Sequence, residues 1–336
     1  MRLPRPPRPA HRLLLALTVL GLLLPPGPAR ASTGPSAEAP ARALLDRAAR
    51  AGQALGYRGT QSVATERPGA RGAHLLEVVH RPGSSTVVRG PAAAPAVTLD
   101  QQSVALLART YRLRIAGTGR CSGRATSVVE ARRPGGSLAG RFEVDERSGL
   151  LLRREVYDDR GRRVSSRAFV DLVLHPGGPS RAATAPASTA GVRRAAEALR
   201  AQGRPVPAEL PHGFRLVAAR PSTAAPVTSG QVVHLAYSDG LSTTSLFVQP
   251  GRLGTTPPAG FRAGSAGRRP VWVRSEAVER AVWSGDGHVW TLVSDAPPAT
   301  VRATLAALPR DPAPPDGVSH RLLRGLARLV GVLDRG

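Results

Sequence analysis

Hydrophobic and polar positions change their period along this chain, and the change separates helical from extended stretches. Between Ala41 and Leu55 the apolar residues recur every three to four positions, and Asp46 lies four residues before Arg50, which predicts an amphipathic helix. From about residue 76 to residue 174, apolar residues instead alternate with polar ones in several short runs. Such alternation predicts antiparallel strands with one buried face, so a helix leading into a β-meander is the simplest topology.

Gly-containing turns separate these runs, and a second set of runs follows a change of composition. The turns are Pro134-Gly135-Gly136, Arg147-Ser148-Gly149 and Asp158-Asp159-Arg160-Gly161. Residues 176–207 are rich in Gly, Pro, Ser, Thr and Ala, which predicts a linker, interrupted by a short helix over Val192 to Gln202. Further strands are predicted at residues 214–217, 232–237, 245–248, 271–273, 281–283 and 289–293. Pro297-Pro298 then opens a predicted closing helix.

The pattern therefore predicts an α+β protein, mostly antiparallel β, with two domains at residues 41–175 and 208–310. A chain of 336 residues is long enough for two domains that each bury a core. We expect the larger aromatic side chains to be core residues rather than a sugar-stacking platform. They are Phe247, Trp272, Trp283 and Trp290.

The first 31 residues have the three parts of a secretory signal. Arginines precede an apolar run from Leu13 to Leu24, and Ala29-Arg30-Ala31 stands before Ser32, which predicts cleavage after Ala31 and a loose linker over residues 32–40. The apolar run is shorter than the roughly 20 residues that cross a bilayer, although an uncleaved anchor is the alternative. We expect the mature chain to lie outside the cytoplasm, in solution or attached peripherally to the membrane.

The tail at residues 311–336 has a basic amphipathic pattern. Leu322 and Leu329 fall on one face of a predicted helix, and Arg324 and Arg328 lie mostly opposite. Such a helix lies on an anionic membrane surface in some proteins, whereas in others a terminal helix packs on its own domain or frays. Both interpretations stay open from the sequence.

The formal net charge of +24 favours polyanionic partners only weakly. The sequence has no Lys, no Asn and a single Ile, Ile115, which indicates a GC-rich coding sequence in which Arg replaces Lys. Its arginines are scattered rather than gathered into one run, so we expect no nucleic-acid partner. Cys121 is the single cysteine, so no intrachain disulfide can form, and we interpret it as a structural residue.

No common catalytic, metal-binding or phosphate-binding motif occurs in the chain. His74 and His80 are six apart on one predicted strand, too far for a two-ligand face without a third residue. Asp158-Asp159 precedes Arg-Gly between two alternating runs, which is typical of a turn rather than of paired catalytic carboxylates. The sequence therefore predicts no catalytic site, no metal site and no cofactor.

Five short motifs, in sequence order, carry a resemblance to a known family. Tyr57-Arg58-Gly59-Thr60 follows the predicted first helix, Phe142-Glu143-Val144-Asp145 precedes Ser148-Gly149-Leu150, and Glu155 to Gly161 follows. In the second domain stand Leu210-Pro211-His212-Gly213-Phe214 and Tyr237-Ser238-Asp239-Gly240-Leu241. This arrangement resembles the RseB/MucB regulators of extracytoplasmic-function sigma factors, especially their actinobacterial members. The stretch from Pro91 to Arg109 does not align with them.

The resemblance implies a first domain like the lipoprotein carriers LolA and LppX, a curved antiparallel sheet partly covered by helices, and a smaller β-rich second domain. It also implies a negative regulator that binds the extracytoplasmic part of a single-pass membrane anti-sigma factor and protects it from proteolysis. Lipid-type ligands relieve some members of the family. A lipid or lipoprotein carrier of the LolA or LppX type is the alternative, and the second domain argues against it because a plain carrier needs only the first.

The hairpin from Tyr237 to Leu241, with Ser238, Asp239 and Gly240 between them, is our candidate for a partner contact. We choose it because exposed loops on rigid sheets commonly carry recognition, and a hairpin turn is expected to be such an exposed loop. A purely structural turn is the alternative.

Overall fold

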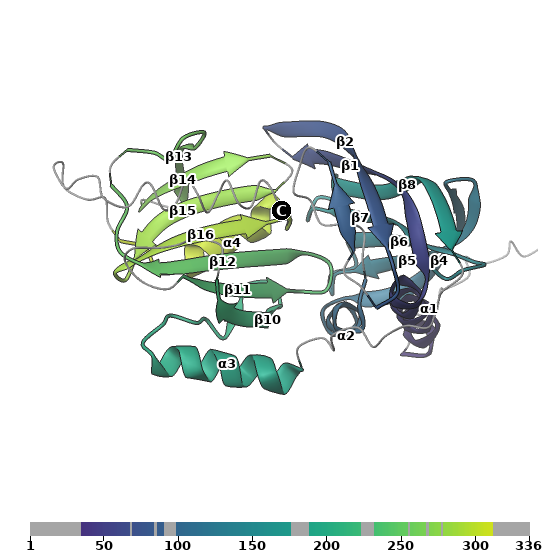
Figure 1. Ribbon diagram of the computed structural model, residues 1–336, viewed down its shortest axis with the longest axis horizontal. Coiled ribbons are helices and arrows are strands. Elements are labelled where there is room, and N and C mark those ends of the chain that lie inside the picture. Colours follow the sequence, from purple (N-terminus) through teal and green to yellow (C-terminus); the bar gives the residue numbers. More distant parts are fainter. Residues whose placement is uncertain are drawn as a thin grey trace, which may run out of the picture. The chain divides into compact units, whose positions relative to one another are not determined.

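The computed structural model describes residues 35–67, 69–83, 86–90, 99–175, 188–222, 232–254, 256–266, 269–276 and 278–311. Within these ranges the chain forms two antiparallel sheets of eight strands each, with four helices (Figure 1). The α+β class expected from the sequence is confirmed. None of the described helices combines the length and the apolar character that crossing a bilayer requires. Two sets of candidate residues lie outside the described ranges: Ala29, Ala31 and Ser32 at the predicted cleavage site, and Leu322, Arg324, Arg328 and Leu329 in the tail.

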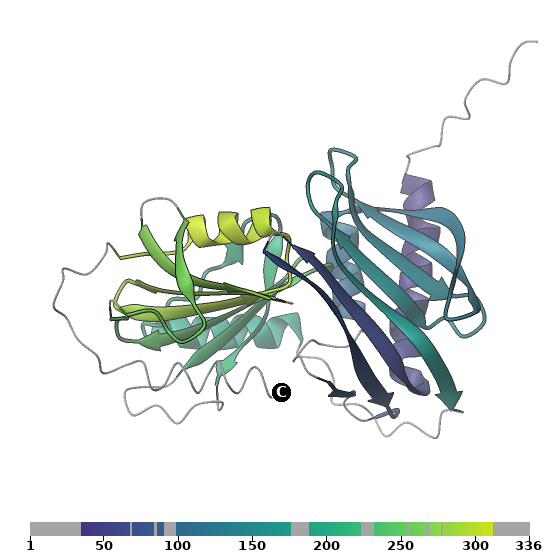
Figure 2. The same ribbon diagram turned by 90° about the horizontal axis from the view of Figure 1, so that it is seen from above.

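The first sheet has the strand order β3-β2-β1-β8-β7-β6-β5-β4. Its strands are β1 (Gly56–Arg67), β2 (Ala70–His80), β3 (Val87–Arg89), β4 (Arg112–Cys121), β5 (Arg124–Arg132), β6 (Leu138–Asp145), β7 (Leu151–Tyr157) and β8 (Arg163–His175). Helices α1 (Pro35–Ala54) and α2 (Gln101–Thr110) pack against it, and Figure 2 shows the strong curvature of the sheet. This is the curved, partly covered sheet that the resemblance implied.

The core of the first domain lies between these helices and strands β4 to β8. Ala41, Leu45 and Ala48 of α1 are buried in this core together with Phe142 and Val144 of β6. The predicted turns have the expected backbone, because Gly136, Gly149 and Gly161 end them with φ of 86°, 77° and 73°, where glycine has no steric penalty.

The second sheet has the order β13-β14-β15-β16-β12-β11-β10-β9. Its strands are β9 (Glu209–Leu210), β10 (Phe214–Pro221), β11 (Val233–Ser238), β12 (Thr243–Pro250), β13 (Arg262–Ala266), β14 (Arg269–Ser275), β15 (Glu279–Gly285) and β16 (His288–Ser294). Helices α3 (Thr189–Ala201) and α4 (Pro298–Ala307) contribute to its core. Trp283 on β15 and Trp290 on β16 are directly opposite each other. Their rings stack with centroids 6.0 Å apart and lie in the centre of that core.

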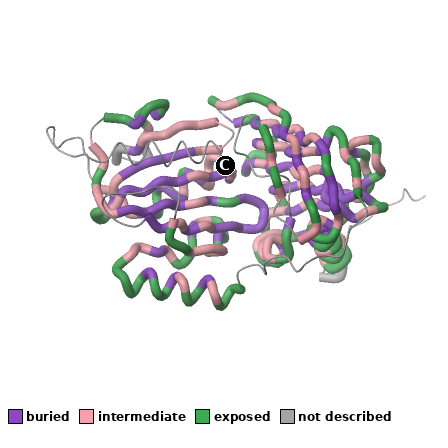
Figure 3. Tube along the Cα trace, in the orientation of Figure 1, coloured by how far each residue is buried: buried purple, intermediate pink, exposed green. Residues whose placement is uncertain are grey.

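Two elements differ from the sequence-based expectation. Helix α2 falls in the stretch that could not be aligned; Asp100 caps it by accepting a hydrogen bond from the Ser103 backbone N–H at 2.7 Å. Helix α3 matches the short helix predicted inside the linker, but Ala196 and Leu199 on it are buried in the second core (Figure 3). That helix is therefore part of the second domain, because its apolar stripe needs the sheet to cover it.

Candidate functional site

The hairpin between β11 and β12 holds the candidate contact residues, and the structure buries all of them. Tyr237, Ser238, Asp239, Gly240 and Leu241 are each buried. The expectation of an exposed loop is therefore wrong. The hairpin continues the sheet of its own domain and packs against α2 and β6 of the first domain. The Tyr237 hydroxyl donates a hydrogen bond to the Pro207 carbonyl, and the Ser238 hydroxyl donates one to the Ser242 carbonyl, whereas the buried Ser242 hydroxyl has no partner among the described residues.

Asp239 is the polar centre of this contact. Its side chain accepts hydrogen bonds from the Tyr111 hydroxyl at 2.5 Å and from the backbone N–H groups of Leu241 and Ser242 at 2.8 and 2.6 Å. Burial raises the pKa of Asp239 above its usual value, against the opposing effect of these donors. Burial and the neighbouring Asp239 also raise the pKa of Tyr111, so the phenol stays a donor.

Two glycines give the hairpin room to dock. A Cβ on Gly240 would lie 2.5 Å from the backbone of α2 at Ser103 and Leu107, and its φ of 88° also requires glycine. A Cβ on Gly140 of β6 would lie 2.6 Å from Leu241, whose side chain joins the core of the first domain. The Y-S-D-G-L motif is thus a contact between the two domains within one chain.

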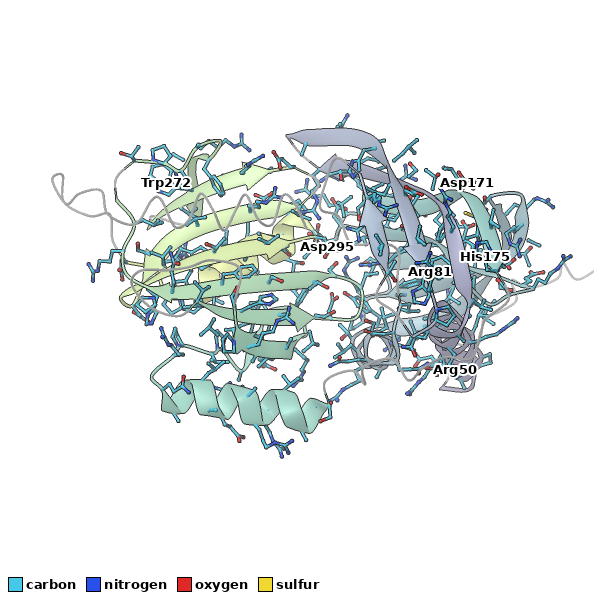
Figure 4. The ribbon with its side chains drawn as sticks, viewed as in Figure 1. Arg50, Arg81, Asp171, His175, Trp272 and Asp295 are labelled. Carbon is cyan, nitrogen blue, oxygen red and sulfur yellow. The ribbon has the colours of Figure 1, made fainter. Side chains whose placement is uncertain are left out.

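A second contact joins the two domains where three arginines of the first sheet surround Asp295. Asp295, which follows β16 and is labelled in Figure 4, has its Oδ2 at 3.7 Å from Arg154 and 3.8 Å from Arg167. Its backbone carbonyl accepts a hydrogen bond from Arg67, and its Oδ1 accepts one from the Thr243 backbone N–H at 2.7 Å. None of these residues was singled out from the sequence. The sequence does hold one signal that could have revealed them. Three arginines occupy strand positions whose alternation predicts a side chain that faces the core.

A pocket of about 480 Å³ opens beside the hairpin contact. Its lining combines apolar and basic side chains with no Asp or Glu; it comprises Leu106, Arg109, Thr110, Tyr111, Arg133, Pro134, His212, Gly213 and Arg215. The Arg133 guanidinium already donates to the backbone carbonyls of Leu138, Tyr157 and Asp158, whereas the exposed Arg109 has no described partner. A second pocket, of about 540 Å³, contains Asp145 and Glu146 together with its arginines and is therefore less positive.

The other candidate residues have structural roles. Asp158 accepts hydrogen bonds from the backbone N–H groups of Arg160 and Arg162 at 3.0 and 2.8 Å, which confirms the turn interpretation. Cys121 is buried, and burial raises the pKa of its thiol. His74 and His80 both lie on β2. No group of three His, Cys, Asp or Glu side chains suited to a metal ion occurs in the described part of the chain.

The comparison with protein families gave a match within the first domain. A family model described as the MucB/RseB N-terminal domain matches residues 70–190. Residues 70–190 are therefore similar to the MucB/RseB N-terminal domain. The resemblance to the RseB/MucB family, stated from the sequence motifs, is thereby confirmed. The MucB/RseB match begins at β2 and ends at the start of α3.

Several solved structures are similar to this chain. A crystal structure of MucB in complex with MucA(peri) has 23% sequence identity and a TM-score of 0.47, covering 81% of this chain and 99% of that one. The MucA/MucB complex from Pseudomonas aeruginosa has 22% identity and a TM-score of 0.45, covering 82% and 100%. A LolA superfamily protein from Nitrosomonas europaea has 10% identity and a TM-score of 0.20, covering 40% and 93%. Comparison with curated proteins gave no match.

Proposed function

We propose that this protein is a non-enzymatic negative regulator that binds the extracytoplasmic part of a single-pass membrane anti-sigma factor and shields it from proteolysis. The match of residues 70–190 to the MucB/RseB N-terminal domain carries this proposal. The partner class is the one that the resemblance implies, and the crystal structure of MucB in complex with MucA(peri) supports it. Binding outside the cytoplasm agrees with the secretory signal predicted at residues 1–31.

The basic pocket is our proposed place for part of the partner. Its apolar lining, Leu106, Tyr111 and Pro134, would take an apolar side chain of an extended segment, and Arg109 and Arg215 would attract acidic residues beside it. Arg215 already forms an ion pair with Glu209 at 3.4 Å, but both side chains are more than half exposed, so this pair is weak and exchangeable. Residues from two domains line the pocket, so binding there would depend on their docking.

The proposal is tested by affinity capture followed by measured binding. The full exported chain, immobilised, is exposed to detergent-solubilised membranes of its source, and retained proteins and lipids are identified together. Recovery of a single-pass protein with a cytoplasmic sigma-binding domain supplies the partner. Its extracytoplasmic segment is then titrated against the protein, and its cleavage by a site-specific membrane-associated protease is compared with and without the protein.

A charge-reversal pair locates the partner on the surface. We expect the double variant Arg109→Glu, Arg215→Glu to weaken binding of that segment by at least about tenfold, since like charges would then face its acidic residues. Arg50→Glu, an exposed position on α1 labelled in Figure 4, is the matched control and should leave affinity unchanged. Equal losses in both variants would remove the pocket from the proposal. Recovery of lipid or lipoprotein without such a membrane protein would instead support the LolA-type carrier.

A further inference from the structure

Three arginines on neighbouring strands of the first sheet face the same way. Arg154 on β7 and Arg167 on β8 are directly opposite each other, and Arg167 is in turn opposite Val63 on β1. Arg67 lies four residues beyond Val63, on the same face, because side chains alternate with a period of two along a strand. The sheet therefore gathers three guanidinium groups on one face.

Arg67 and Arg167 are buried and Arg154 is partly buried, and several of their donors have no hydrogen-bond partner among the described residues. Arg67 is only 1% exposed, and its Nε and Nη1 have no hydrogen-bond partner among the described residues; Nη2 donates to the Asp295 carbonyl. Arg154 and Arg167 approach the Asp295 carboxylate at 3.7 and 3.8 Å, too far for a hydrogen bond. Each guanidinium carries five N–H donors, so the cluster offers far more donors than its neighbours accept.

The charge of the cluster is unbalanced as well. Three cations face one carboxylate, with Glu279 acting on Arg67 as a further anion. Burial lowers the pKa of Arg167 to about 10; Asp295 opposes this change, and the charges of Arg154 and Arg67 add to it. The nearby His74 adds no anion and has its own pKa lowered by burial and by Arg167. Uncompensated buried charges are costly, so an additional anion would stabilise this arrangement.

We propose that Arg67, Arg154 and Arg167 form a binding site for a phosphate group. A tetrahedral oxyanion with several acceptor oxygens matches guanidinium donors that converge from three strands, because arginine binds phosphate oxygens through paired, charge-assisted hydrogen bonds. The phosphate is either free inorganic phosphate or part of a lipid headgroup. The site stands on its own and does not depend on the anti-sigma partner.

Asp295 lies in the positive electrostatic potential of these arginines. Its carboxylate is held in place by the Thr243 backbone N–H and not by hydrogen bonds to Arg154 or Arg167. It therefore competes electrostatically with the incoming anion while leaving the arginine donors available. Replacing it by the isosteric amide removes the competing charge and retains the acceptor for Thr243.

The first experiment measures binding of inorganic phosphate to the full chain. Thermal unfolding is recorded in sodium phosphate and in sodium chloride at equal ionic strength and pH 7, and isothermal titration measures the same binding directly. We expect phosphate to raise the melting temperature by about 3 °C or more at saturating concentration, since a ligand that binds only the folded state stabilises it. Absence of both a shift and a titration signal, for phosphate and for headgroup phosphate in the vesicle assay below, would overturn the proposal.

Matched variants assign the site. Arg154→Gln and Arg67→Gln should each abolish the phosphate-dependent shift, while Arg58→Gln, an exposed arginine on β1, should retain it. Asp295→Asn should bind phosphate several-fold more tightly than the native chain, an effect that a merely destabilised variant would not show. Persistence of phosphate binding in both arginine variants, or no tightening in Asp295→Asn, would refute the assignment.

Vesicle flotation separates the two sources of phosphate. Vesicles of phosphatidylglycerol, of phosphatidic acid and of phosphatidylcholine are compared for each variant, with inorganic phosphate as competitor. Flotation with phosphatidic acid that Arg154→Gln and inorganic phosphate both abolish indicates a lipid headgroup. Binding of inorganic phosphate without Arg154-dependent flotation indicates the free anion. Flotation that Arg154→Gln and Arg67→Gln leave intact, with no binding of inorganic phosphate, contradicts the site.

Discussion

The two sheets have the same number of strands and the same antiparallel pairing, but the faces that they bury differ in chemistry. In the second sheet, the buried face centres on Trp283 and Trp290 and is mostly apolar, with the buried hydroxyls of Thr244 and Ser294 hydrogen-bonded to each other at one end. In the first sheet, Arg154 is directly opposite Phe142, so the face that carries the helix-covered core also carries a guanidinium group. The second sheet is closed by its own helices, whereas the first is completed by groups from the other domain.

Because of this difference, the first domain is stabilised partly by residues of the second, whereas the second is stabilised by its own residues. Leu241 of the second domain is part of the first domain's core, but none of the described first-domain residues belongs to the core around Trp283. The first domain should therefore lose stability when the hairpin is withdrawn, and the second should lose little. If the protein has the regulatory function proposed above, this arrangement would couple its two domains.

The largest expected effect comes from the tryptophan pair. Trp283→Ala should lower the free energy of unfolding by about 4 kcal/mol, because it removes a large buried side chain that the surrounding core cannot replace. Denaturant unfolding followed by far-UV circular dichroism measures the change. Trp272→Ala, at a partly buried position on the other side of the sheet, is the control and should cost clearly less. Equal costs would mean that the pair is not the centre of this core.

The interdomain contact should be broken by one methyl group. Gly240→Ala places a Cβ against the backbone of α2 in a backbone conformation that favours glycine, so we expect a loss of about 3 kcal/mol. Limited proteolysis should then cut between the domains faster. Gly161→Ala has a similar φ but an empty neighbourhood, so it should cost about 1 kcal/mol and leave proteolysis unchanged. Identical behaviour of the two variants would contradict docking by the hairpin.

Acid should reveal a titrating group in the second sheet. Burial, and to a lesser extent Arg220, lower the pKa of His234 to about 4, where its ring stacks on Phe247. Because the unfolded state binds this proton more readily, stability should fall as the pH drops from about 6.5 to 4. His234→Gln should flatten that part of the pH–stability curve, measured by denaturant unfolding. The control is His212→Asn, at an exposed turn position; an unchanged slope in His234→Gln would exclude His234 as the cause.

The smallest effect should come from the charged ladder on the first sheet. Glu130 lies between Arg114 and Arg132 at 2.6 and 2.8 Å, in pairs that are partly open to solvent. Glu130→Gln should therefore change the free energy of unfolding by less than about 1 kcal/mol, and high salt should reduce the difference further. Asp145→Asn is the comparison, since Asp145 is buried and should cost more. A loss above about 2 kcal/mol for Glu130→Gln would show that the ladder is structural.

Local patterns predicted much of the fold but little of the site. Alternation found six strands of the second sheet, and the turn at Gly161 followed from its own residues. Helix α2 was missed because its ten residues give only a short apolar pattern, and it is held by packing on the first sheet. The hairpin at Asp239 was recognised as a turn, but its burial could not be foreseen because the burying surface belongs to α2 and β6.

By itself, the sequence determined the α+β class, the two β-rich parts of the chain, their main turns and the resemblance to the MucB/RseB family. These features depend on neighbouring residues in the chain and on short motifs, which a linear pattern records. The tertiary structure alone decided that Leu241 completes the first core and that Arg67, Arg154 and Arg167 converge near Asp295. Those contacts join residues far apart in the chain, and their energies depend on burial and on distances that no local pattern contains.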